Sequence, residues 1–166
     1  MEYPVGISYF AWSASQVTRL FATGPPAAER AAAAPNTLWG MPGMIQETNR
    51  YFFITAIGLF VFLLGTTYLL ATAIPGKPWL ALPFVLSPAL LLNTLVNWDL
   101  LALLFVAGAV WAWHRCVTTT RVAKWAAVAG VMVGLGTAVK LYPLFILGAF
   151  LVVAIRRREW LRFGVA

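Results

Sequence analysis

The chain has 166 residues, of which 61% are hydrophobic and only 10% are charged. A soluble domain carries about 25% charged residues to keep its surface wetted, so this composition excludes an ordinary soluble domain and indicates a protein that lies in lipid. The net charge of +7 would suit nucleic acid. The basic residues, however, stand in short clusters between apolar runs, as they do in cytoplasmic loops, and this excludes a nucleic-acid-binding protein.

One cysteine, Cys116, and one histidine, His114, are present in the chain. A disulfide framework or a thiolate metal site needs several cysteines, and a histidine metal centre needs several histidines. We therefore expect neither a metal nor a cofactor. His114 beside Arg115 is interpreted as an interfacial residue, and Cys116 as a small apolar filler.

Residues 1–50 are predicted to form an extracytoplasmic loop that contains an amphipathic helix over residues 5–21. On a helical wheel Ser8 and Arg19 share one face, and apolar side chains occupy the opposite arc. Such a helix lies in the headgroup plane of a membrane, although a poor transmembrane span is an alternative that this pattern leaves open. The rest of the segment is rich in Pro, Ala and Gly, which predicts a loop with one short helix near residues 27–34.

Residues 51–166 are predicted to form an all-α, polytopic transmembrane bundle. Long apolar runs are typical of helices that cross a hydrocarbon core of about 30 Å. The five predicted spans lie near residues 51–74, 79–98, 99–115, 122–139 and 141–156. Pro83 and Pro88 are expected to kink the second span. Three glycines of the fourth span are expected at close-packing positions, namely Gly130, Gly134 and Gly136.

The basic residues predict an orientation, because cytoplasmic loops carry an excess of Lys and Arg. With the Tyr51 end of the first span outside, eight basic residues lie inside, namely Lys77, Arg115, Arg121, Lys124, Arg156, Arg157, Arg158 and Arg162. Four then lie outside, namely Arg19, Arg30, Arg50 and Lys140. The prediction is a multi-pass cell-membrane protein whose C-terminus is in the cytoplasm.

Asp99 is the only aspartate of the chain, and it follows Asn97-Trp98 at the junction of two apolar runs. In the predicted topology these residues lie at the outer membrane face, a depth that also favours tryptophan. A structural interpretation is a short turn whose polar side chains cap the following helix. The functional interpretation is a site role for the carboxylate.

Lys140 interrupts an apolar stretch that runs from Trp125 to Ile155. Each half has about 15 residues, or about 22 Å of helix, which is short for a span. Lys140-Leu141-Tyr142-Pro143 is therefore predicted to be an outer hairpin, recessed toward the membrane and on the same side as Asp99. A structural interpretation is an ion pair with Asp99 or a snorkelling lysine. The functional interpretation, which we favour, is a cation for an anionic group such as a lipid phosphate.

Three stretches of the sequence stand out together. Glu2-Tyr3-Pro4-Val5 lies near the start, Asn97-Trp98-Asp99 opens a helix, and a glycine-rich run from Gly134 ends in Lys140-Leu141-Tyr142-Pro143. These stretches resemble glycosyltransferase family 87, polytopic enzymes of the GT-C type that are similar to polyprenyl-phosphate-mannose-dependent mannosyltransferases. The resemblance covers nearly the whole chain, and the run that ends in Lys-Leu-Tyr-Pro is its most specific part.

The resemblance implies an integral membrane transferase of the cell envelope. It would move a sugar, mannose in those relatives, from a polyprenyl phosphate to a lipid or glycan hydroxyl on the outer face, with inversion. Its partners would be the polyprenyl-phosphate sugar donor and membrane lipids, with no nucleic acid. Family members are longer, and their general base is expected in a loop upstream of the Tyr-Pro segment. The chain is therefore expected to be a fragment that is inactive without the missing segments of a longer parent chain.

The candidate substrate-binding and phosphate-binding residues are Lys140, Asp99, Asn97, Tyr142 and Tyr3. Lys140 is expected to stabilise the leaving phosphate as negative charge grows on it, while Asp99 and Asn97 orient Lys140 or bind sugar hydroxyls. No catalytic residue is assigned. The alternative function is a non-catalytic or truncated membrane protein that only packs against partners. A transporter would need more ionisable residues within the spans and repeated broken helices.

Overall fold

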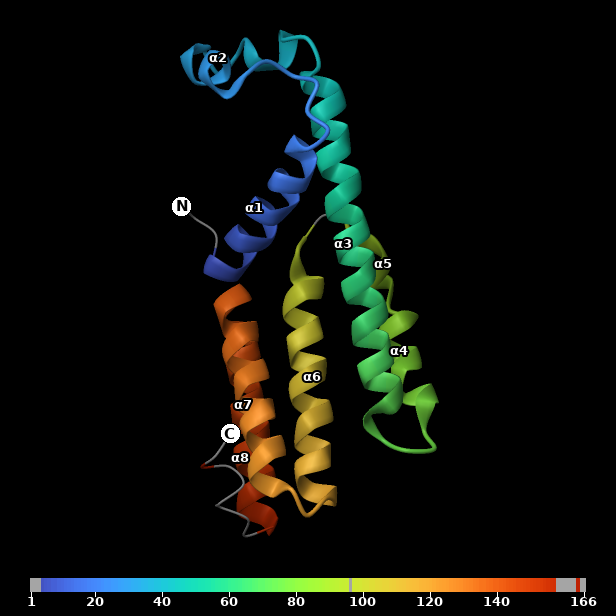
Figure 1. Cartoon of the computed structure of the whole chain (residues 1–166). Helices are drawn as coiled ribbons and strands as arrows, with labels where there is room; N and C mark the ends of the chain where they lie inside the picture. Colours follow the sequence, from blue (N-terminus) through green and yellow to red (C-terminus); the bar gives the residue numbers. More distant parts are fainter. Residues whose placement is uncertain (1–3, 96, 158–163, 165–166) are drawn as a thin grey trace. The chain divides into compact units, whose positions relative to one another are not determined.

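The computed structural model describes residues 4–95, 97–157 and 164, and this part of the chain contains helices and no strand (Figure 1). The all-α fold class is therefore as predicted. The chain forms two compact units, Ser8–Gly58 and a larger unit made of Met1–Ile7 and Leu59–Ala166. The larger unit holds most of the predicted transmembrane region.

Three helices of the described residues are long and apolar enough to cross a membrane. They are α3 (Met44–Ala73), α6 (Asp99–Thr118) and α7 (Val122–Val139). At 1.5 Å per residue, α6 is about 30 Å long, which matches the hydrocarbon core of a bilayer. Helix α3 begins seven residues before the predicted Tyr51, so part of the expected loop is helical.

The predicted second span, residues 79–98, does not form one helix. The described part of this stretch is divided into a 3₁₀ helix η2 (Pro78–Ala81), α4 (Leu82–Val85) and α5 (Pro88–Asn93). Proline lacks an amide hydrogen and clashes with the preceding helical turn. Ser87, directly before Pro88, is accordingly extended, with φ −64° and ψ 120°. Pro83 and Pro88 were expected to kink one long helix, but this stretch is instead divided into separate short helices.

The predicted fifth span is also shorter than expected. It consists of a 3₁₀ helix η3 (Tyr142–Phe145) followed by α8 (Ile146–Arg157). The twelve residues of α8 cover about 18 Å, which is less than the thickness of a bilayer core. The number of long apolar helices among the described residues is thus three, against the five predicted spans.

The main core of the larger unit lies between α6, α7 and α8. Small residues let the helices approach closely, and larger side chains from all three fill the remaining space; the buried members are Ala109, Ala112, Trp113, Ala129, Val133 and Phe150. The rings of Trp113 and Phe150 stack with their centroids 4.4 Å apart, which joins α8 to α6. Helices α6 and α7 run antiparallel, and α8 returns toward the turn between them (Figure 1).

The glycines of α7 contribute unequally to this packing. A Cβ on Gly136 would lie 3.0 Å from Pro143 Cβ and 3.2 Å from Phe105 Cβ, so this position needs glycine for close approach. A Cβ on Gly134 would meet nothing within 4 Å. The expectation of close packing is therefore right for Gly136 and wrong for Gly134.

A second, smaller core lies at the opposite end of the α6–α7 hairpin. Ile7, from the first turn of α1 (Val5–Arg19), packs with Ala102 of α6 and Val139 of α7. A Cβ on Gly6 would lie 2.9 Å from the Val139 Cα, so the backbones of α1 and α7 nearly touch here. This contact fixes the start of α1 beside the residue that precedes Lys140.

The smaller unit contains the rest of α1, the short α2 (Ala27–Ala32), the 3₁₀ helix η1 (Leu38–Gly40) and the first half of α3. The short helix expected near residues 27–34 is thus present as α2. The guanidinium of Arg30 donates two hydrogen bonds of 2.7 Å to the carboxylate of Glu47, and these bonds raise the pKa of Arg30. This bidentate pair ties α2 to the first turn of α3.

Candidate functional site

Three candidate residues meet where α6 begins and α7 ends. The Lys140 ammonium forms an ion pair with Asp99 and donates a hydrogen bond to Asn97 Oδ1 at 3.0 Å. The predicted meeting of Asp99 and Lys140 is confirmed, although the two residues are 41 positions apart in the sequence. An ion pair is also what the purely structural interpretation expects, so the contact alone does not decide the role.

The backbone explains how the two charged side chains reach each other. Helix α6 begins at Asp99, and Trp98 occupies the cap position without a side-chain capping hydrogen bond. The carboxylate therefore does not cap the helix, and the capping interpretation of Asp99 is wrong. Helix α7 ends at Val139, and Lys140 is extended with φ −153° and ψ 152° while its amide N–H donates to Gly136 O at 2.9 Å. The extended backbone directs the chain from α7 into η3.

Of the two tyrosine candidates, Tyr142 and Tyr3, the structure places only Tyr142 near the Asp99–Lys140 contact. The Tyr142 hydroxyl lies 3.5 Å from the backbone oxygen of Asp99, which is a long and weak hydrogen bond. The adjacent Pro143 is buried against Gly136, which holds Tyr142 beside the start of α6. Tyr3 lies outside the described residues.

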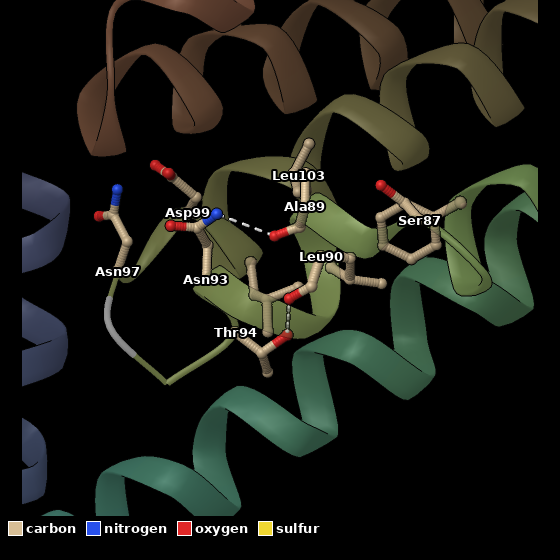
Figure 2. A pocket seen from close by; sticks show the side chains of 10 residues that line it. Ser87, Ala89, Leu90, Asn93, Thr94, Asn97, Asp99 and Leu103 are labelled. Carbon is tan, nitrogen blue, oxygen red and sulfur yellow. Dashed lines mark hydrogen bonds between the residues drawn. The ribbon is translucent and has the colours of Figure 1, made fainter.

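A pocket opens beside Asp99, between the α4–α5 stretch and the first turns of α6 (Figure 2). Its volume is about 290 Å³, close to the lower limit for small-molecule sites. The wall combines amide, hydroxyl and carboxylate side chains with apolar ones, and the lining residues are Phe84, Ser87, Ala89, Leu90, Asn93, Thr94, Asn97, Asp99, Leu100 and Leu103. Asp99 and Asn97 therefore belong both to the Lys140 contact and to the pocket wall.

Asn93 and Thr94 are site residues that sequence reasoning missed. The Asn93 amide donates to Ala89 O at 2.9 Å, and the Thr94 hydroxyl donates to Leu90 O, so both side chains are held against their own helical turn (Figure 2). The Asn93 Oδ1 acceptor is not used by this bond. These residues were hidden in an expected span, but Asn93 and Asn97 are four positions apart, a spacing that places side chains near one another on a helix.

The charged pair is accessible from outside the protein. The side chains of Lys140 and Asp99 are 25% and 35% exposed, respectively. An ammonium has three donors, and the contacts with Asp99 and Asn97 involve two acceptors. Lys140 can therefore bind a further anionic oxygen without leaving its present partners.

No group of three or more His, Cys, Asp or Glu side chains that would hold a metal ion occurs among residues 4–95, 97–157 and 164. The polar contacts described above are made by one carboxylate, one ammonium, amides and hydroxyls. Groups of this kind bind hydroxyl-rich or phosphorylated ligands by hydrogen bonds and charge.

Comparison with protein-family models, with curated proteins and with solved structures gives no match for this chain. Its function is therefore inferred from the site itself.

Proposed function

We propose that the chain forms part of an integral membrane glycosyltransferase, in which it binds the polyprenyl-phosphate sugar donor, with mannose as the sugar. The observation that carries the proposal is the position of Asp99. Its carboxylate contacts the Lys140 ammonium and also lines a pocket with amide and hydroxyl walls. One site thus offers a cation beside a small, partly apolar pocket that carries polar side chains, which are the two features that a sugar phosphate needs.

Lys140 supports the phosphate half of this assignment. A phosphate oxygen that accepts from the ammonium forms a charge-assisted hydrogen bond, which is about twice as strong as a neutral one. Breaking the bond between sugar and phosphate increases the negative charge on the phosphate, so a fixed cation stabilises the leaving group. Asn97 and Asp99 hold the ammonium in position for this role.

The pocket supports the sugar half. Sugar hydroxyls both donate and accept hydrogen bonds, and the pocket offers a carboxylate, two amides and two hydroxyls. Its apolar residues, among them Phe84 and Leu103, suit the carbon face of a sugar ring or the first part of a prenyl chain. The acceptor would be a lipid or glycan hydroxyl.

The membrane arrangement belongs to the same proposal. The chain passes five times along the bundle, with the broken α4–α5 stretch and α8 as the two passes that are not long apolar helices. Val5, Tyr9 and Trp12 of α1 are each at least 60% exposed on one helical face, which suits an interfacial helix in the headgroup plane. The Asp99–Lys140 contact would then face outward, and the arginine-rich C-terminus would lie in the cytoplasm of a cell-membrane protein.

The proposal is tested by donor binding to the purified full chain in detergent. A short-chain polyprenyl-phosphate mannose should bind at least about tenfold more tightly than the matching uncharged prenyl alcohol, because a hydrogen bond to a charged group contributes on the order of 1.5–3 kcal/mol. Lys140→Met should remove that preference. Membranes from cells that carry the same substitution should also transfer less mannose to their lipid and glycan acceptors.

A matched control is Lys77→Met, which removes an exposed lysine in the turn after α3. Gly65 and Leu69 of α3 lie against Leu104 and Gly108 of α6, so the two helices run in the same direction and Lys77 follows the end away from Asp99. It should leave the preference for the phosphorylated donor unchanged. Equal binding of the donor and the alcohol by the unmodified chain would contradict the proposal and favour a role in packing alone.

A further inference from the structure

Arg115 lies in a cluster of aromatic and basic side chains where α6 ends and α7 begins. Its guanidinium carbon is 4.1 Å from the ring centroid of Trp111, one helical turn earlier, and 5.4 Å from that of Trp125 on α7. The two indole rings meet edge to face, with centroids 5.4 Å apart and an interplanar angle of 83°. The guanidinium is thus fixed by two rings from two helices.

A second cation shares one of these rings. The Lys124 ammonium is 5.3 Å from the Trp125 ring centroid. Asp99 is the only side-chain carboxylate in the described part of the larger unit, and it lies at the other end of α6. The two cations therefore repel each other without a neutralising carboxylate among the described residues, and an anion placed between them would lower the energy of the cluster.

The stacking leaves the hydrogen-bonding groups of Arg115 available. Rings contact a guanidinium through its flat face, whereas its five N–H groups point outward in the plane. Among the described residues no acceptor is hydrogen-bonded to this side chain and no carboxylate is ion-paired with it. A planar fork of this kind matches two oxygens of a phosphate.

The position of the cluster identifies the source of that phosphate. Arg115 is in the last turn of α6, and Lys124 is in the first turn of α7, so both lie at the end of helices that are apolar and long enough to cross a membrane. Tryptophan is enriched at this depth, beside the lipid headgroups. The exposed Arg121 directly precedes α7, and the exposed Arg156 lies in the last turn of α8, which returns toward the turn between α6 and α7 (Figure 1). Both add positive charge at this end of the unit.

We propose that Arg115, Trp111, Trp125 and Lys124 form a binding site for the headgroup phosphate of an anionic phospholipid. The rings hold the guanidinium in one orientation, the guanidinium donates two hydrogen bonds to the phosphate, and Lys124 supplies a second positive charge. The site is independent of the proposed transferase function, because it lies at the opposite end of the α6–α7 hairpin from Asp99.

Native mass spectrometry of the full chain, released from an uncharged detergent, tests the proposal. Dioctanoyl phosphatidylglycerol and dioctanoyl phosphatidylcholine are the probes. Phosphatidylglycerol should bind at least about fivefold more tightly, the effect expected for one basic residue near an anionic group. Arg115→Gln should remove this preference, and Arg115→Lys, which keeps the charge but not the fork, should reduce it about threefold.

Trp125→Leu changes no charge, so it distinguishes a specific lipid site that needs the indole ring from non-specific attraction by positive charge. We expect an affinity for phosphatidylglycerol about two- to fivefold lower, the usual contribution of a cation–π contact. Lys77→Gln, the control, removes a lysine at the same end that contacts no ring in the described structure, and should change the affinity less than twofold. Circular dichroism checks that each variant keeps its helices.

Three results would overturn the proposal. One is equal affinity for the two lipids. Another is that Lys77→Gln lowers the affinity for phosphatidylglycerol as much as Arg115→Gln does, while Arg115→Lys leaves it unchanged. That result would show that the lipid is attracted by net charge alone. The third is displacement of the lipid by excess inorganic phosphate as readily as by phosphatidylglycerol, which would indicate a site for a free anion.

Discussion

At the start of α6, Lys140 contacts a carboxylate and an amide beside a pocket, whereas at the end of α6 Arg115 and Lys124 lie against indole rings without a carboxylate among the described residues. We call these the Asp99 end and the Arg115 end. Charge at the Asp99 end is balanced within the protein, and the site can discriminate ligands by the geometry of donors and acceptors. Charge at the Arg115 end is unbalanced among the described residues, so we expect this end to select for anions.

The difference in net charge between the two ends also indicates how the helices are oriented in the membrane. Asp99 and Lys140 cancel, so the Asp99 end carries little net charge from its described residues, while the Arg115 end carries Lys77, Arg121 and Arg156 in addition to the cluster. Cytoplasmic ends of membrane helices are enriched in Lys and Arg. Under the proposed function, this asymmetry favours the Arg115 end as the cytoplasmic one.

The largest expected effect is on the contact that holds α8 in the bundle. Phe150→Ala removes the ring stacked on Trp113, and both residues are more than 90% buried. Loss of a buried phenylalanine costs about 3–5 kcal/mol in water-soluble proteins. Lipid is itself apolar, so we expect about 2–3 kcal/mol here, measured as the free energy of unfolding in sodium dodecyl sulfate.

The matched control for Phe150→Ala is Phe145→Ala, because Phe145 is 79% exposed. This change should alter the free energy of unfolding by less than about 0.5 kcal/mol. If the two variants lowered the free energy of unfolding equally, the stacking of Phe150 on Trp113 would not be what holds α8 against α6. Binding at the Asp99 end should persist in Phe150→Ala, since its residues come from α5, α6 and the segment after α7.

A smaller change in the free energy of unfolding is expected when Gly136→Ala adds one methyl group near the Asp99 end. Gly136→Ala would push against Pro143 and Phe105 at 3.0 to 3.2 Å, and overpacking of this kind costs about 1–3 kcal/mol. Because Pro143 holds Tyr142 and follows Lys140 closely, donor binding should weaken as well. Binding of phosphatidylglycerol at the Arg115 end should not change.

Gly134→Ala is the control in the same helix, since its Cβ meets nothing within 4 Å. It should leave the free energy of unfolding unchanged or raise it by up to about 1 kcal/mol, as expected for alanine in place of glycine in a helix. If Gly134→Ala lowered the free energy of unfolding as much as Gly136→Ala, the packing of α7 would differ from that in this structure.

Hydropathy predicted α6 and α7 well because each is a continuous apolar helix without an internal proline. The same signal was wrong for residues 79–98, where hydropathy is high but two prolines, Pro83 and Pro88, interrupt the helix. Hydropathy records only the preference for lipid, whereas helix continuity depends on backbone hydrogen bonds that proline cannot make. The predicted start of α3, at Tyr51, lies seven residues after its actual start at Met44 for a related reason. The first helical turns contain the charged Glu47 and Arg50, so the apolar run begins later than the helix.

The candidate site was partly predictable. Asp99 and Lys140 were expected together because each stands out in an apolar sequence and the topology places both at one face. The pocket was not predictable, since it depends on how the broken α4–α5 stretch packs beside α6. The Arg115 cluster has a local signal in the four-residue spacing of Trp111 and Arg115, but its second ring comes from another helix.

The smallest expected effect concerns the Asp99–Lys140 pair, and a double-mutant cycle measures it. Both side chains are partly exposed, so the coupling energy of Asp99→Asn and Lys140→Met should be only about 0.5–1 kcal/mol in the free energy of unfolding, and it should fall as salt is added. Donor binding should respond differently from stability. Asp99→Asn leaves the ammonium without its carboxylate partner, so affinity for the bare polyprenyl phosphate should rise, while Lys140→Met should lower it. A pair that served stability alone would give the same change in binding for both substitutions, and opposite changes would therefore separate a ligand-binding cation from a structural one.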